Sequence, residues 1–389
     1  MIKRYLADFI TNDLKEKMVF VAGPRQVGKT ILAQYIGRQN YTSSSYFNWD
    51  YQPDRKNIIN LQFPGEAKLL IFDELHKYKQ WKNYIKGLYD KFKETFHIIV
   101  TGSAKLDIYR KGGDSLMGRY FHYILHPFSL AELESRDNKP LPFKKLNFST
   151  IKSTEVIKQF LHFGPFPEPF LKQSTTYWRR WQIERNDRLV KEDIRDLRMI
   201  GDLSSLQILV DLLPSKTASL LSIDNIRQDL QVAHKTAVNY LNILELFYFH
   251  FRIYPYVRKP VRSLKKMSKL YLYDWSSLTN EGAKFENLVA SHLLKFAHFI
   301  QSTQGYKTQL FYLRDPEGRE VDFLITVDNN PWFAVETKLD AVSVNPALSY
   351  FGKKLKIPFL FQVTRQSGFD QFREGVRVIS ADKFLTAFV

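Results

Sequence analysis

Cysteine is missing from this chain, and its absence excludes several kinds of chemistry. Without thiols there is no disulfide, no thiolate metal site and no cysteine nucleophile. A protein without disulfides suits a reducing compartment, so we expect a cytoplasmic location.

Long hydrophobic runs are also missing. The first ten residues, MIKRYLADFI, lack the apolar core of a signal peptide. The longest apolar stretch, residues 243–256, is interrupted by Glu245, His250 and Arg252. It is too polar to span a bilayer, so we expect no membrane segment.

Acidic residues are in short supply, because 57 Lys and Arg face 40 Asp and Glu, for a formal net charge of +17. Such a charge favours an anionic partner, and nucleic acid, with DNA as the leading form, is the one we expect. A generally basic proteome would give the same number. A hydrophobic content of 44% is typical of a globular protein, and 389 residues predict two or three domains.

A phosphate-binding motif occupies residues 23–30. The letters GPRQVGKT fit G-x-x-x-x-G-K-[ST], and the flanking segments MVFVA and TILAQYI predict a strand before the loop and a helix after it. Lys29 is expected to reach the β- and γ-phosphates, and Thr30 to hold Mg²⁺. A glycine-rich turn that matches by chance is the alternative. The residues expected to bind ATP are Gly23, Pro24, Arg25, Gln26, Val27, Gly28, Lys29 and Thr30.

A buried strand that ends in two acids follows along the chain. The segment KLLIFDE places four apolar residues before Asp73 and Glu74, which predicts a parallel strand whose end presents carboxylates. This is a Walker B pattern, in which Asp73 would hold Mg²⁺ through its water shell. Glu74 would be the general base that polarises the attacking water. Taken alone, the same letters would indicate an ordinary strand end.

The next predicted strand, residues 97–100, is followed by Thr101 and Ser103. A polar side chain here would lie beside the γ-phosphate, between the two motifs. Ser103 or Thr101 is therefore a candidate to orient water or sense the nucleotide. A turn or a helix cap explains these residues equally well.

The order of these motifs resembles one family. GPRQVGKT, LLIFDELHKYKQWKNYIKGLYD, IIVTGSA and SLMGRYFHYILHPFSLAEL are similar to the AAA-type ATP-binding proteins of bacteria and archaea, in which a P-loop ATPase is joined to a C-terminal domain of unknown function. The resemblance implies an AAA+-like parallel sheet, ATP and Mg²⁺ as cofactors, and a homo-oligomer or ring. In such rings an arginine reaches the γ-phosphate of the next subunit. Arg119 is the candidate here, with a structural ion pair as the alternative.

Three domains are predicted: an ATPase (1–150), a helical linker with a winged-helix-like module (151–270) and an α/β domain (271–389). The polar, proline-containing segment 137–154 marks the end of the ATPase. Residues 223–230 and 235–247 are typical of a helix-turn-helix, and 246–253 would supply the wing strands. The residues that would then face DNA are His234, Lys235, Thr236 and Asn239. A structural lid or a protein interface is the alternative.

The segment 252–269 is basic and contains no acid. Tyr254 and Tyr256 lie among its cations, and such a mixture suits a nucleic-acid backbone. A solvated loop is the alternative. The basic residues are Arg252, Arg258, Lys259, Arg262, Lys265, Lys266 and Lys269.

A second candidate site lies near the C-terminus. Glu286 falls in a predicted helix and Asp322 in a predicted strand. Glu336 and Lys338 share one face of the next strand, because they are two residues apart. If the strands pair as a hairpin, Asp322 comes alongside them. The predicted elements are the helix 282–296, the strands 319–325 and 333–338, and a turn at 328–330.

This pattern resembles the PD-(D/E)XK nuclease fold, although REVD replaces a literal PD. The resemblance implies that Asp322 and Glu336 bind Mg²⁺, that Glu286 completes the metal shell and that Lys338 is the catalytic lysine. An exposed acidic hairpin, or a nuclease-like fold without activity, would show the same letters.

Three functions are compatible with these motifs. The first is an ATPase that couples nucleotide hydrolysis to DNA binding or processing. The second is a nucleotide-gated switch or scaffold whose nuclease-like domain is inactive and binds a protein. The third, a small-molecule kinase, is disfavoured because Glu74 beside Asp73 suits activation of water, and because two further domains follow.

Overall fold

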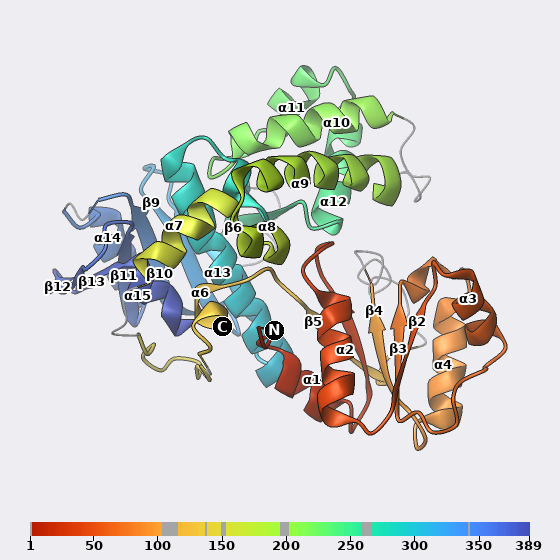
Figure 1. Ribbon diagram of the computed structural model, residues 1–389. Helices are drawn as coiled ribbons and strands as arrows, with labels where there is room; N and C mark the ends of the chain where they lie inside the picture. The colour runs from red at the N-terminus through yellow and green to blue at the C-terminus, as the bar shows by residue number, and fades with distance from the viewer. Residues whose placement is uncertain are drawn as a thin grey trace. The chain divides into compact units, whose positions relative to one another are not determined.

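The computed structural model describes residues 2–102, 116–136, 138–148, 153–194, 202–257, 267–340 and 343–389. The chain forms two compact units (Figure 1): Met1–Pro127 with Leu246–Tyr248, and Phe128–Glu245 with Phe249–Val389. The main segment of the first unit ends at Pro127, before residue 150, and the predicted middle and C-terminal domains fall within the second unit except for Leu246–Tyr248. The division between those two domains stays a prediction.

The first unit is built on a five-stranded parallel sheet of order β2-β3-β4-β1-β5. All five residues of β1 and of β3 are buried, as a parallel sheet covered on both faces requires. β4 lies between β1 and β3, so the two predicted nucleotide motifs end on either side of it. The parallel P-loop fold predicted for this part is confirmed. The strands are β1 Met18–Ala22, β2 Ser44–Asn48, β3 Leu69–Asp73, β4 His97–Thr101 and β5 Tyr120–Ile124.

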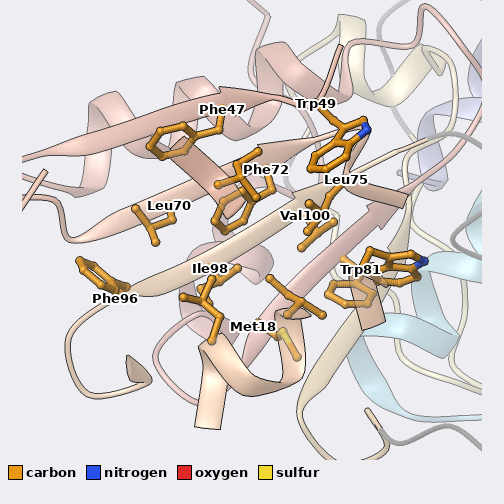
Figure 2. Packing of buried hydrophobic residues seen from close by; sticks show 14 of the residues in the cluster. Met18, Phe47, Trp49, Leu70, Phe72, Leu75, Trp81, Phe96, Ile98 and Val100 are labelled. Carbon is orange, nitrogen blue, oxygen red and sulfur yellow. The ribbon is translucent and has the colours of Figure 1, made fainter. Parts of the chain in front are cut away.

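The core of this unit packs alternate strand residues mainly against α4, with Ile58 of α3 in the same cluster (Figure 2). Phe72 and Val100 belong to the same buried cluster as Trp81, the first residue of α4. Because successive side chains of a strand point to opposite faces, Asp73 and Thr101 fall on the other face of the sheet. The helices are α1 Ala7–Asp13, α2 Lys29–Asn40, α3 Gln52–Ile59, the short η1 Leu75–Lys77 and α4 Trp81–Phe92.

The second unit contains a mixed sheet of eight strands, in the order β12-β13-β11-β10-β9-β8-β6-β7. The long helix α13 packs along it, with Phe296 against Trp332 and Phe333. The strands are β6 His250–Pro255, β7 Lys269–Leu272, β8 Thr308–Arg314, β9 Glu320–Val327, β10 Asn330–Lys338, β11 Phe359–Thr364, β12 Asp370–Arg373 and β13 Val376–Ser380.

The remaining elements of this unit are helical. In its N-terminal half they are α6 Leu130–Leu133, α7 Thr154–Phe163, α8 Pro167–Lys172, α9 Thr175–Arg188, η3 Leu189–Ile194, α10 Leu203–Leu212, η5 Leu213–Lys216, α11 Ile223–Asp229 and α12 His234–Leu246. In its C-terminal half they are η7 Trp275–Ser277, α13 Glu281–Gln304, α14 Pro346–Leu355, α15 Ala381–Phe384 and η8 Leu385–Ala387. No helix of the described ranges is both long and apolar enough to cross a membrane.

The predicted hairpin is present. β9 and β10 pair antiparallel, with Phe323 opposite Val335. Asp328 and Asn329 form the turn with φ of 49° and 65°, the left-handed conformation that a two-residue hairpin turn requires and that Asp and Asn tolerate.

The predicted helix-turn-helix corresponds to α11 and α12. His234, Lys235 and Asn239 are exposed, whereas Thr236 is half-buried. The predicted wing differs from the structure, because Leu246 still belongs to α12 and β6 begins at His250. β6 pairs with β7 and also with β8, so it belongs to the eight-stranded sheet.

Candidate functional sites

The P-loop connects β1 to α2, in the strand–loop–helix context that the sequence predicts. Gly23 and Gly28 have φ of 142° and 93°, where glycine is favoured. A Cβ on Gly23 would lie 2.4 Å from the carbonyl oxygen of Leu125. The buried ammonium of Lys29 donates to the carbonyls of Gly23 at 3.0 Å and Pro24 at 2.8 Å. The loop therefore wraps closely around the lysine that is predicted to meet phosphate.

Asp73 lies at the centre of a hydrogen-bond network at the ends of β3 and β4. Its Oδ2 accepts from the Thr30 hydroxyl at 2.7 Å and from the Tyr46 hydroxyl at 3.0 Å. Its Oδ1 accepts from the Thr101 hydroxyl at 2.6 Å. The structure thus brings together Thr30 and Asp73, which the sequence predicts to share a metal ion. It places the candidate Thr101 beside them and adds Tyr46.

Glu74 follows in a left-handed conformation, with φ of 55°. Its N–H donates to the carbonyl of Thr101 at 3.0 Å, which holds this unfavourable backbone in place. Burial raises the pKa of its carboxyl, although the charges of Lys29 and Lys77 oppose the shift. A raised pKa brings a carboxylate closer to the range in which a general base works best.

Arg4 is a residue of this site that sequence reasoning missed. The residue is 7% exposed, and its guanidinium donates to the carbonyl of Val27, in the P-loop, and to that of His126, which follows β5. No motif marks this arginine, because the contact joins segments far apart in the sequence.

The described residues leave two of the predicted catalytic residues without a place in this network. Ser103 lies outside the described residues. Arg119 forms an ion pair with Asp90, with Nε 2.7 Å from Oδ1, which is the structural alternative to an arginine finger. Its role between subunits stays a prediction.

The residues of the N-terminal site fit a nucleotide with its magnesium ion. The first N–H groups of a helix have no partner within it and attract phosphate, and α2 begins within the P-loop. Lys29 supplies a positive charge there, and the Thr30 hydroxyl and Asp73 carboxylate are hard oxygen ligands of the kind that Mg²⁺ prefers.

The C-terminal candidate residues also come together. Asp322 Oδ2 accepts from the N–H and hydroxyl of Thr337, at 2.9 and 2.7 Å. The N–H of Asp322 donates to Glu336 at 3.4 Å. Lys338 Nζ lies 2.7 Å from Glu336 Oε1. Burial lowers the pKa of Lys338, but the bond to Glu336 and the charges of the neighbouring carboxylates together raise the pKa overall.

Crowding of acids marks this site. Burial and the charge of Asp322 raise the pKa of Glu286 to about 8 and that of Glu336 to about 7. Tyr271 donates to Glu286 Oε1 at 2.7 Å. Neighbouring carboxylates repel each other when both are ionised, so one carboxyl of such a pair keeps its proton to a higher pH.

One basic residue enters the cluster, contrary to the sequence interpretation. Lys269 is expected among cations that face nucleic acid, but it is 4% exposed and its Nζ lies 2.7 Å from Glu320 Oε1. Arg252 is engaged as well, since it pairs with Glu245. The other basic residues of that segment lie outside the described ranges.

A divalent metal ion does not fit the C-terminal cluster as it stands. Within the described residues, no three His, Asp or Glu side chains are grouped so that they could hold a metal ion. The acids are instead arranged around the ammonium groups of Lys269 and Lys338. The residues predicted for the site are present together, but their arrangement is not that of a metal shell.

The comparisons with known proteins divide the chain into three parts. Residues 15–134 match the family model of an AAA domain. Residues 154–282 and 281–384 match two domains of unknown function, DUF8612 and DUF4143.

Similar proteins are found in archaea and bacteria. MJ1544, an uncharacterized protein of Methanocaldococcus jannaschii, is 26% identical over 90% of this chain and 82% of its own length. Rv2008c, an uncharacterized protein of Mycobacterium tuberculosis, is 20% identical over 81% of this chain and 69% of its own.

Two solved structures show weaker similarity. The RuvB Holliday junction branch migration motor of Thermotoga maritima covers 63% of this chain and 87% of its own, at 15% identity and a TM-score of 0.32. PCH-2 of C. elegans covers 61% and 66%, at 13% identity and a TM-score of 0.24. At these scores neither adds to the family match. The P-loop geometry and the parallel sheet show that the N-terminal part of this chain has a P-loop fold, and residues 15–134 of it match an AAA domain.

Proposed function

We propose that this chain hydrolyses ATP in its first unit and couples that hydrolysis to binding or processing of DNA by its second unit. The observation that carries the ATPase part is the Asp73 network, in which the P-loop hydroxyl of Thr30 and the strand-end hydroxyl of Thr101 share one carboxylate. The network joins residues that the sequence assigns to ATP and Mg²⁺.

The residues of the N-terminal site have separate tasks in hydrolysis. Lys29 stabilises negative charge on the β- and γ-phosphates, and for this it exchanges the carbonyls of Gly23 and Pro24 for phosphate oxygens. Mg²⁺, when bound, supplies charge neutralisation on the transferred phosphoryl group. Thr101 orients Asp73, and Glu74 accepts the proton of the attacking water. Arg119 would act from a neighbouring subunit only after its pair with Asp90 opens.

Phosphate release from ATP tests the first half of this proposal. Lys29→Ala and Glu74→Gln should each lower kcat by about a hundredfold or more. Lys79→Ala, an exposed lysine near the site in sequence, is the matched control and should hydrolyse ATP as wild type does. Full activity of Lys29→Ala would reject the site.

The DNA part of the proposal depends on charge and on α12. The net charge of +17 favours a polyanion, and His234, Lys235 and Asn239 are exposed at the start of a helix that follows a turn. ATP hydrolysis should therefore rise when duplex DNA is added at low salt. An unchanged rate, together with no DNA binding at low salt, would reject the coupling.

Nuclease activity is the finer alternative to DNA binding, and it would require a metal ion to replace the ammonium of Lys269 among the acids. Asp322, Glu336 and Lys338 lie together on the hairpin, as the resemblance to PD-(D/E)XK nucleases implies. Because the ammonium of Lys269 lies among these acids, nicking of plasmid DNA in Mg²⁺ or Mn²⁺ is expected only if that ammonium moves away. Nicking by this site should be lost in Lys338→Ala and retained in Lys353→Ala, which replaces an exposed lysine of α14. Equal cleavage by wild type and Lys338→Ala would exclude this site as its source.

One observation favours a second candidate function, a nucleotide-gated switch whose C-terminal unit binds a partner protein without cleaving DNA. The ammonium of Lys269 lies among the acids that the nuclease interpretation assigns to metal. This candidate predicts ATP binding with slow turnover and no nicking in either metal ion.

A further inference from the structure

The buried position of Lys269 among acidic residues of the second unit is not explained by any sequence motif. Its Nζ lies 2.7 Å from Glu320 Oε1, 3.4 Å from Glu286 Oε1 and 3.5 Å from Asp322 Oδ1. One buried cation is therefore shared by three carboxylates. Two of them, Glu286 and Asp322, are residues that the sequence predicts to bind metal.

The position of this ammonium is held by the sheet. Lys269 is the first residue of β7, where it pairs with Ile253 of β6 and bridges Leu220. Its Nζ also lies 5.8 Å from the centre of the Tyr312 ring. A lysine on a paired strand, buried against an aromatic ring, differs from a surface lysine that samples many rotamers.

An ammonium and a divalent ion would compete for the same oxygens. Mg²⁺ requires oxygen ligands at about 2.0–2.1 Å in near-octahedral geometry. Carboxylates that surround an ammonium at hydrogen-bond distance would have to close in around a metal, and the ammonium would repel it. Two cations at one buried position are unfavourable, because low dielectric strengthens their repulsion.

We propose that Lys269 is the resident cation of the C-terminal acidic cluster: it takes the place of a divalent metal ion, and the cluster binds such an ion only when that ammonium is removed. This inference goes beyond the proposed function, and it holds whether or not the first unit hydrolyses ATP. The acidic cluster of the second unit would then have the ligands for a metal ion but would hold the Lys269 ammonium in its place.

Mn²⁺ binding to the full-length protein tests this inference, with the bound ion counted by electron paramagnetic resonance and no nucleotide present. Asp73→Asn is included in every variant, so that the N-terminal site does not contribute. The parent should bind no Mn²⁺ through Asp322. Lys269→Met keeps the length of the side chain without its charge. It should bind one Mn²⁺ with an affinity on the order of a hundredfold or more above any Mn²⁺ binding by the parent, which carries Asp73→Asn alone.

A charge-balanced variant controls for the chance that Lys269→Met alone fails to fold. Lys269→Met leaves buried acids without their cation, whereas Lys269→Met with Glu320→Gln removes one charge of each sign and retains the other acids. This double variant should fold and should also bind one Mn²⁺. Adding Asp322→Asn should abolish the binding.

Two results would overturn the inference. One is a parent protein that binds Mn²⁺ in a manner that Asp322→Asn abolishes, since the metal would then coexist with Lys269. The other is a folded charge-balanced variant that gains no Mn²⁺. Neither result depends on ATP hydrolysis, so failure here is distinguishable from failure of the proposed function.

Discussion

Replacing Arg4 with methionine should loosen the P-loop and weaken nucleotide binding. The buried guanidinium donates to the carbonyls of Val27 and His126, and methionine donates to neither. Hydrogen bonds that involve a charged group contribute about 1.5–3 kcal/mol each. Because both bonds come from one side chain, their losses are not independent. We expect local stability to fall by about 3 kcal/mol.

Hydrogen exchange of peptides that cover β1 and the P-loop measures this loss directly. A decrease of about 3 kcal/mol corresponds to exchange that is on the order of a hundredfold faster, if these amides exchange through local opening. A fluorescent ATP analogue should bind at least about tenfold more weakly, a free-energy loss of about 1.4 kcal/mol. The larger effect on exchange is expected, because bound nucleotide itself holds the loop.

Two further variants separate the contact from general effects. Arg4→Lys keeps the charge but lacks the fork that reaches two carbonyls, so its effect should be intermediate. Lys3→Met removes an exposed ion pair with Asp8 and should change stability by less than about 1 kcal/mol. Wild-type exchange and wild-type nucleotide binding in Arg4→Met would show that these two hydrogen bonds do not stabilise the P-loop.

Three other predictions follow from the structure. Gly23→Ala places a Cβ 2.4 Å from the Leu125 carbonyl oxygen. Binding of an ATP analogue should therefore be lost, while the circular dichroism spectrum of the chain should stay close to that of wild type. Normal binding would contradict this. Lys235→Glu should weaken DNA binding and lower its salt dependence by about one charge, whereas Lys172→Glu, exposed on α8, should do so less; equal effects would remove α12 from the interface. Burial lowers the pKa of His292 to about 4, and its ring is held by Leu288 and Leu130. The unfolded state therefore binds more protons below pH 6.5, so stability should fall by about 2 kcal/mol between pH 6.5 and pH 5, and urea unfolding of His292→Gln should show a smaller fall.

The N-terminal site could largely be predicted from the sequence, because its motifs are local. A P-loop needs glycines at fixed spacing next to a strand and a helix, so Gly23, Gly28 and Lys29 identify themselves. The sequence does not separate Thr101 from Ser103, and Ser103 lies outside the described residues. Thr101 is the last residue of β4, beside β3, and its bond to Asp73 follows from strand order rather than from any local pattern.

The C-terminal site shows the limit of sequence reasoning more clearly. The sequence predicts the hairpin and the face shared by Glu336 and Lys338, because residues two apart on a strand point to the same side. Glu320 lies in the REVD segment, but no feature of the sequence assigns it to the cluster. Lys269 is one cation in a basic segment, and its sequence neighbours suggest a surface.

By itself, the sequence determined the chemistry of the nucleotide loop, the α/β alternation of the first unit and the hairpin near the C-terminus, because each depends on residues close together along the chain. Only the tertiary structure decided where two cations lie. Arg4, which lies 23 residues before Val27 in the sequence, donates to the P-loop carbonyl of Val27. Lys269 lies within an acidic cluster instead of facing solvent. Both placements arise from long-range packing, in which burial makes an unpaired charge so costly that each cation must meet specific oxygens.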